Sequence, residues 1–94
     1  MRLLIAYDVG TADEGGTRRL RRVARACQDY GQRVQKSLFE CILSQADWVL
    51  LSARLLEEMD PAHDSIRVYH LDGDVRVDHH GVNEPLPMDG PLIV

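Results

Sequence analysis

The chain opens with an apolar run that is long enough for one β-strand and ends in a carboxylate. Every residue from Leu3 to Tyr7 is apolar, and Asp8 follows directly. Because polar residues do not alternate with the apolar ones, the run predicts a central strand that is covered on both faces. Such a strand needs neighbours on either side and helices against it. A chain of 94 residues provides these within a single domain.

A helix is predicted after the glycine-containing loop that follows this strand. Its apolar residues recur at the spacing of one helix face: Leu20, Val23, Ala24 and Cys27. The helix is expected to run to about Tyr30 and to end in a left-handed cap at Gly31. Thr11 and Glu14 have the spacing of a capping box, but two glycines follow directly, so the sequence does not fix the first residue of the helix.

The middle of the chain predicts a hairpin and a second helix. Residues 33–43 are too long and too evenly β-prone for one strand, so we interpret them as two strands with a bend near Lys36 and Ser37. Ser44 is expected to cap a helix, with Asp47 three residues on. The apolar stripe of that helix is Trp48, Leu51, Leu55 and Met59. Alternation over residues 65–71 then predicts a fourth core strand.

The predicted order of elements is β-α-β-β-α-β, which specifies an α+β fold of the ferredoxin-like type. In this fold both helices cover one face of a four-stranded antiparallel sheet. The other face is left bare, and the β-prone segments 75–77 and 92–94 have no place in so compact a domain. A second copy of the chain would cover the bare face and accept these segments at its sheet edge. We therefore expect a homodimer, with a ferredoxin-like domain over residues 1–78 and an exchanged C-terminal tail over residues 79–94.

Basic residues are concentrated in one part of a chain that is acidic overall. Residues 1–36 carry eight Lys or Arg and four Asp or Glu, whereas residues 37–94 carry three and eleven. Between residues 18 and 36 the only acid is Asp29, so pairing along the helix explains the basic run poorly. One guanidinium group can bind two phosphate oxygens at once, so the basic run favours a nucleic-acid partner. Contacts to phosphate do not select a base sequence. The residues expected to contact phosphate are Arg18, Arg19, Arg22, Arg25, Arg33 and Lys36.

Asp8 is the candidate site residue, because it ends an apolar strand and opens a loop that contains glycine. Two interpretations remain open: the side chain caps the following turn, or it is a carboxylate at the mouth of a site. One carboxylate is a poor metal site by itself. A twofold axis near Asp8 would bring two copies together, and both could then bind one hydrated Mg²⁺.

Other features of the sequence limit the class of protein. Cys27 and Cys41 lack metal-ligand spacing and are expected to be reduced core residues. The neighbouring side chains of His79 and His80 should point to opposite faces of a strand, so a shared metal is not expected. No apolar run approaches the roughly 20 residues of a membrane span, and no signal-peptide pattern is present. A cytoplasmic protein without a membrane partner is therefore expected.

Several of these segments together resemble the CRISPR-associated protein two family. They are Tyr7-Asp8-Val9, the arginine-rich helix, the stretch from Tyr30 to Cys41, and the stretch from Asp64 to Leu71. The resemblance implies a homodimer of ferredoxin-like domains and a metal-dependent endonuclease that cuts RNA or double-stranded DNA. It implies that Asp8 is the ligand of Mg²⁺, with Mn²⁺ as a substitute.

The resemblance also implies partners and further site residues. Family members bridge two dimers of the CRISPR integrase during spacer capture. In the enzyme interpretation Gln35 and Ser37 would donate hydrogen bonds near the cut. Because no general base accompanies Asp8, the alternative is a non-catalytic scaffold that binds nucleic acid and bridges integrase dimers. A regulatory domain for a small ligand is a third interpretation, but such a ligand would need only one or two of the arginines.

Overall fold

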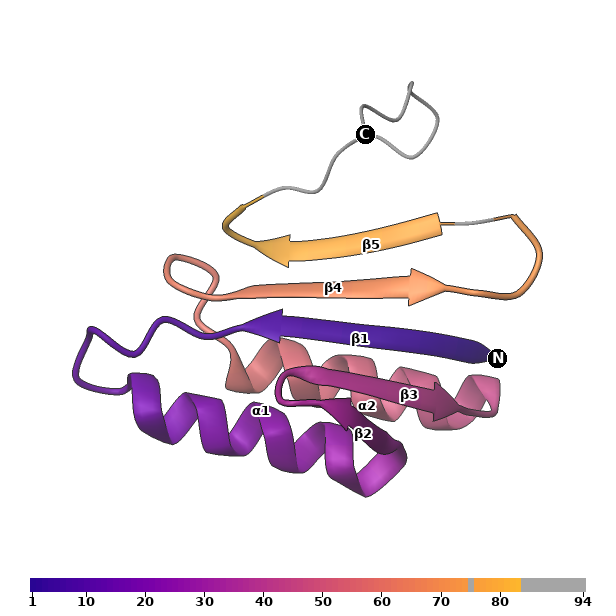
Figure 1. The fold of residues 1–94 in the computed structure, drawn as a ribbon, viewed down its shortest axis with the longest axis horizontal. Helices are drawn as coiled ribbons and strands as arrows, with labels where there is room; N and C mark the ends of the chain where they lie inside the picture. The colour runs from indigo at the N-terminus through magenta and orange to yellow at the C-terminus, as the bar shows by residue number, and fades with distance from the viewer. Residues whose placement is uncertain (75, 84–94) are drawn as a thin grey trace.

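Strand β1 (Arg2–Asp8) lies in the middle of an antiparallel sheet in the computed structural model, which describes residues 1–74 and 76–83 (Figure 1). The sheet order is β2-β3-β1-β4-β5, and both helices pack on the same face. The remaining elements are α1 (Gly16–Tyr30), β2 (Gln32–Gln35), β3 (Leu38–Ile42), α2 (Gln45–Glu58), β4 (Ser65–His70) and β5 (Arg76–Gly81). The first four strands and two helices confirm the ferredoxin-like α+β fold.

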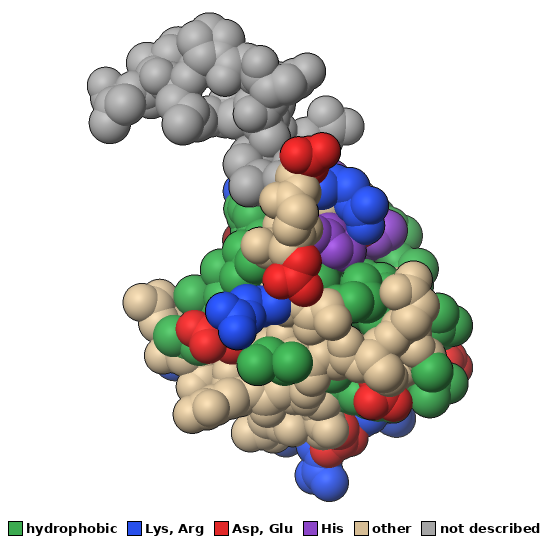
Figure 2. All heavy atoms as spheres, turned by 90° about the vertical axis from the view of Figure 1, so that its right-hand side faces the viewer, with side chains coloured by type: hydrophobic (Ala, Val, Ile, Leu, Met, Phe, Trp, Pro, Cys, Tyr) green, Lys and Arg blue, Asp and Glu red, His purple; other side chains and the backbone are tan. Residues whose placement is uncertain are grey.

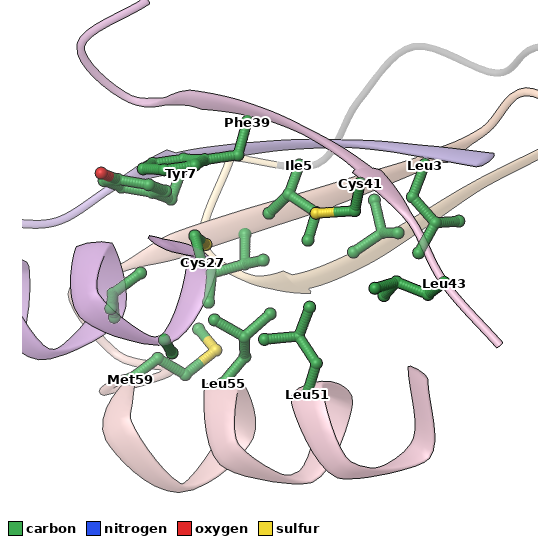
Figure 3. Close-up of a cluster of buried hydrophobic side chains, with 14 of the residues drawn as sticks. Leu3, Ile5, Tyr7, Cys27, Phe39, Cys41, Leu43, Leu51, Leu55 and Met59 are labelled. Carbon is green, nitrogen blue, oxygen red and sulfur yellow. The ribbon is translucent and has the colours of Figure 1, made fainter. Parts of the chain in front are cut away.

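The core lies between the sheet and the two helices. Leu3 and Ile5 alternate with less buried residues along β1, and α2 turns Leu51 and Leu55 toward them (Figure 3). Phe39 of β3 completes this layer. Burial of these side chains supplies the main stabilisation of the fold. The predicted apolar stripe of α2 is therefore confirmed.

The start and end of α1 differ from the sequence expectations. The helix begins at Gly16, and the N-cap residue Gly15 makes no side-chain capping bond, so the expected capping box of Thr11 and Glu14 is wrong. Gly31 does end the helix, but its φ of −150° is extended rather than left-handed. A Cβ atom there would overlap the Sγ atom of Cys41, so glycine is required by a close approach between elements.

The hairpin and the second helix follow the sequence predictions. The turn at Lys36 and Ser37 separates β2 from β3, as expected. The hydroxyl of Ser44 accepts a hydrogen bond of 3.1 Å from the backbone N–H of Asp47, which confirms the predicted cap. No helix among residues 1–74 and 76–83 is long and apolar enough to span a membrane.

Strand β5 pairs with β4 of its own chain. The register sets His80 opposite Ile66 and His79 opposite Arg67, so the two histidines lie on opposite faces as predicted. The expectation that the segment 75–77 has no place within one domain is wrong, because β5, which includes residues 76 and 77, pairs with the edge of β4. The exchanged tail expected from the sequence spans residues 79–94. Residues 79–81 belong to β5 and pair with β4 here, and residues 84–94, including the segment 92–94, lie outside the described residues.

Candidate functional site

Asp8 lies at the carboxyl end of β1, at the left end of the sheet in Figure 1. Its side chain is exposed, and its cross-strand neighbour is Ser65, the first residue of β4. Within residues 1–74 and 76–83 no hydrogen bond or ion pair engages the Asp8 carboxylate. The carboxylate is therefore accessible for a ligand.

Two hollows meet at Asp8. One lies over β1 and β4 on the face without helices and has a volume of about 280 Å³. The other lies between the start of α1 and the turn after β2 and has a volume of about 420 Å³. The second hollow is lined by Tyr7, Asp8, Val9, Leu20, Arg21, Ala24, Arg33, Lys36 and Ser37. A carboxylate thus borders a surface that carries three cationic side chains.

The turn between β2 and β3 is held against the end of β1. The backbone N–H of Tyr7 donates to the carbonyl of Ser37 at 3.1 Å, and the Tyr7 hydroxyl lies 3.4 Å from the carbonyl of Lys36. The Arg33 guanidinium lies 5.1 Å from the centre of the Phe39 ring, within the range of a cation–π contact. These contacts hold the hairpin that carries Arg33, Lys36 and Ser37 in the wall of the hollow that Asp8 also lines.

Three of the four arginines predicted on the outer face of α1 have acidic partners. Arg22 lies 3.5 Å from Glu58 of α2, and Arg25 lies 3.1 Å from Asp29. Arg19 is bound by two carboxylates in the interior, as described below. Pairing along the helix accounts for Arg25 alone, and the partners of Arg19 and Arg22 come from other elements. Exposed pairs such as that of Arg25 are weak, and phosphate can displace them.

The structure adds a residue that the sequence analysis missed. Arg21 lines the same hollow as Asp8, Arg33 and Lys36, whereas the predicted residues Arg18, Arg22, Arg25 and Gln35 line neither hollow. A sequence signal for Arg21 exists, because it lies one residue beyond Leu20 and three before Ala24, on the border of the apolar stripe. Arginine at such a border lies beside the strand ends that the helix covers.

A second group of possible metal ligands lies in the neighbouring loops. The ligand atoms of Asp13, Asp60 and His63 lie within 4.8 Å of one another. Their charges are already compensated, because Arg19 donates to Asp13 at 2.8 and 2.9 Å, and His63 Nδ1 lies 2.8 Å from Asp60. A divalent cation would have to compete with the Arg19 guanidinium for the same carboxylate. We interpret the group as an ion-pair network that joins two loops.

The pKa values of this network agree with that interpretation. Hydrogen bonds from Arg19 lower the pKa of Asp13 to about 2. The backbone N–H of Ala62, and then His63, lower the pKa of Asp60, while the hydrogen bond to Asp60 raises the pKa of His63. Each shift favours the charged form, which is the form that an ion pair needs.

The opposite end of the sheet carries a separate polar cluster beside β5. Figure 2 shows acidic, basic and histidine side chains gathered at this end. His70 Nε2 lies 2.7 Å from Asp78, and the imidazole meets the Trp48 ring edge-on at 6.0 Å between centres. His79 Nε2 lies 2.7 Å from the carbonyl oxygen of Val82. The contact between His70 and Asp78 attaches β5 to β4 at the end of the sheet away from Asp8. His79 and Val82 instead lie toward the Asp8 end, because Gly81 pairs with Ser65 and Ser65 pairs with Asp8.

Comparison with known proteins identifies the family. Residues 1–77 match the family described as CRISPR associated protein Cas2. The chain belongs to the Cas2 family. The family that the sequence resembles is thereby confirmed, and the match covers every element of the fold up to the first residues of β5.

Cas2 relatives cover the chain almost completely. The chain is 52% identical over 96 residues to the CRISPR-associated endoribonuclease Cas2 of Nitratidesulfovibrio vulgaris, which covers 100% of this chain and 94% of that protein. It is 45% identical over 95 residues to the CRISPR-associated endonuclease Cas2 of Halalkalibacterium halodurans, with 99% of each chain covered.

Solved structures share the fold. The crystal structure of Streptococcus pyogenes Cas2 at pH 6.5 superposes with a TM-score of 0.69 at 49% identity, over 76% of this chain and 86% of that one. A hypothetical protein from Thermus thermophilus, TT1823, gives a TM-score of 0.65 at 35% identity, over 92% and 95% of the two chains. The ferredoxin-like assignment of this Cas2 chain therefore has support independent of its sequence pattern.

Proposed function

We propose that the protein is a metal-dependent endonuclease that hydrolyses phosphodiester bonds in RNA or double-stranded DNA and acts as a homodimer in CRISPR adaptation. The names of its relatives, endoribonuclease and endonuclease, support the reaction class. The observation that carries the proposal is the position of Asp8. Its exposed carboxylate borders a hollow whose other charged side chains are all cationic.

The cationic side chains bind the substrate in this proposal. Arg21, Arg33 and Lys36 oppose the charge of the phosphates, and the planar guanidinium groups match two phosphate oxygens at once. The hydroxyl of Ser37 donates a hydrogen bond to a neighbouring phosphate or sugar oxygen. Because all these contacts address the backbone of the nucleic acid, they favour a polyanion without selecting its sequence.

Asp8 is the residue that would hold the metal ion, and Mg²⁺ or Mn²⁺ fits its chemistry. Both ions prefer oxygen ligands, and Mg²⁺ keeps several waters, so an exposed carboxylate in an open hollow suits them. When bound, the ion lowers the pKa of a coordinated water and neutralises charge on the phosphate. Asp8 of a second subunit would supply the second carboxylate, which is why the proposal includes a homodimer.

Cleavage by an Asp8→Asn variant tests the proposal. Labelled single-stranded RNA and double-stranded DNA are incubated with the full-length protein across a range of pH, with Mg²⁺ or Mn²⁺. Removing the charged ligand should lower the cleavage rate at least about 100-fold, because the metal supplies several kcal/mol of charge stabilisation. The affinity for nucleic acid should change little, because Asp8 is not one of the cationic residues.

The matched control is Asp74→Asn, which removes an exposed carboxylate at the other end of the sheet. It should cleave at the wild-type rate. A wild-type protein that binds nucleic acid but cleaves neither substrate under any condition contradicts the enzyme proposal. That result would favour the scaffold that bridges integrase dimers, for which neutralising the cationic residues, and not Asp8, should impair spacer acquisition.

A further inference from the structure

Asp64 has a completely buried carboxylate, at 0% exposure, immediately before β4. A buried charge is costly unless every oxygen is paired and hydrogen-bonded. Here each oxygen accepts two hydrogen bonds. Oδ1 accepts from the backbone N–H of Gly10 at 3.1 Å and from Arg19 Nη2 at 3.3 Å. Oδ2 accepts from Arg19 Nε at 2.9 Å and from the backbone N–H of Asp60 at 2.8 Å.

The two members of this ion pair hold both polar backbone groups of Gly10. Asp64 binds its N–H, and Arg19 Nη2 donates to its carbonyl oxygen at 3.2 Å. Arg19 also binds Asp13 further along the same loop. One guanidinium on α1 and one carboxylate before β4 thus fix the segment that leaves β1 two residues after Asp8.

Val9 packs in the hydrophobic core, so the ion pair acts on the backbone that follows it. Pairing between β1 and β4 ends at Asp8 and Ser65, and the loop beyond contains Gly10, Gly15 and Gly16, which restrict the backbone least. An apolar pair of similar size can fill a buried space as stably as an ion pair does. Apolar side chains, however, cannot bind the N–H and the carbonyl of a glycine. The hydrogen bonds to Gly10 are what the charged pair adds.

We propose that Arg19 and Asp64 are positioning residues, whose ion pair fixes the backbone at Gly10 and thereby the direction in which Asp8 faces its metal ion. The inference rests on the proposed function of Asp8. It also gives Arg19 a role other than the phosphate contact expected from the sequence. Ligands held by an ordered outer layer of hydrogen bonds bind metal more tightly than mobile ones.

The first test compares Arg19→Lys with Arg54→Lys in the full-length protein, using Mn²⁺ binding followed by electron paramagnetic resonance. Lysine keeps the charge beside Asp64 but loses the planar fork that reaches the carbonyl of Gly10. We expect Mn²⁺ affinity to fall about 10-fold in Arg19→Lys. Arg54 pairs with Asp29 on the helix layer, so its replacement should leave the affinity unchanged. Equal affinity in wild type and Arg19→Lys overturns the proposal.

A second readout does not depend on the metal. Amide hydrogen exchange followed by NMR should accelerate about 10-fold at Gly10 in Arg19→Lys, while exchange at Ile5 in the middle of β1 stays the same. A variant that merely loosened the fold would accelerate both. If the wild-type protein binds no Mn²⁺ through Asp8, the proposed function fails, and this measurement still decides whether the pair holds the backbone. Unchanged exchange at Gly10 would show that the ion pair does not hold the backbone.

The double variant Arg19→Met with Asp64→Leu guards against a loss of folding in the single variant. It replaces the buried pair with apolar side chains of similar length and removes every side-chain hydrogen bond to Gly10. A folded double variant with at least 10-fold weaker Mn²⁺ binding supports the proposal. A folded double variant that binds Mn²⁺ as tightly as wild type overturns it.

Discussion

The carboxyl group of Asp13 links the ion-pair network to pH. Its pKa in the folded protein, about 2, lies below its ordinary value of 3.8, chiefly because of the hydrogen bonds from Arg19. The folded state therefore gains stability from Asp13 above pH 3.8 and loses it as the pH falls toward 2. Urea unfolding between pH 2 and pH 6 should show this loss in the wild-type protein and a smaller one in Asp13→Asn.

The loss of stability at low pH that remains in the Asp13→Asn variant has an expected source. Hydrogen bonds from arginines also lower the pKa of Asp29, with Arg54 the larger cause. An Asp29→Asn variant should therefore reduce the acid sensitivity separately. An Asp13→Asn protein with the full wild-type loss of stability would show that the Asp13 pair does not contribute in solution.

At the residue scale the sequence predicts where the candidate site begins but not how its charges are shared. Asp8, Lys36 and Ser37 are predictable because a strand end and a tight turn place them by local rules. The role of Arg19 is not, because its partner Asp64 lies 45 residues away in the chain. Helix spacing shows whether an arginine lies on the polar face of the helix or at the border of its apolar stripe. Only the tertiary structure shows which carboxylate pairs with it.

At the scale of elements, the outer and inner faces of α2 should respond differently to the same substitution. Leu51 is fully buried against the sheet, whereas its neighbour Leu50 is 59% exposed. Leu51→Ala should lower the free energy of unfolding by about 2–5 kcal/mol, since it leaves a cavity in the core. Leu50→Ala should change it by about 0.5 kcal/mol or less. Similar losses in the two variants, measured by urea unfolding, would contradict this packing.

The sequence predicts elements where a local rule and the tertiary structure agree. Ser44 at the start of α2 is such a case, because a cap needs only residues three positions apart. Gly31 is the contrary case. Its place at the end of α1 is predictable from the sequence, but the reason for glycine there is the close approach of the Cys41 sulfur and the Glu40 carbonyl of β3, which no local pattern reveals.

At the scale of the whole molecule, the sheet face without helices remains the predicted homodimer surface. Ile42 is 77% exposed on that face, opposite Arg2 of β1. Light scattering at micromolar concentration should give a molar mass of twice the 10.6 kDa of one chain. Ile42→Glu should shift the mass toward that of the monomer, because burying an added charge between two subunits is costly.

Val49→Glu provides the control for this measurement. Val49 is 61% exposed on α2, in the helix layer and away from the bare sheet face, so the dimer should persist. A wild-type mass of 10.6 kDa would remove the reason for expecting a second Asp8 at the site.

The pairing of the last described strand could not be settled from the sequence. An edge strand makes the same backbone hydrogen bonds with its own chain as with a partner subunit, so composition cannot distinguish the two. In this structure β5 pairs with β4 of its own chain, from Arg76 opposite His70 to Gly81 opposite Ser65.

The burial of the two cysteines has a practical consequence for chemical labelling of the protein. Cys27 and Cys41 both lie in the core, and burial raises the pKa of Cys27 to about 12. Alkylating reagents attack the thiolate, so the native protein resists them and modification follows only the opening of the core. The rate at which these cysteines are alkylated therefore reports how often the core opens, and mass spectrometry can follow it without any engineered label.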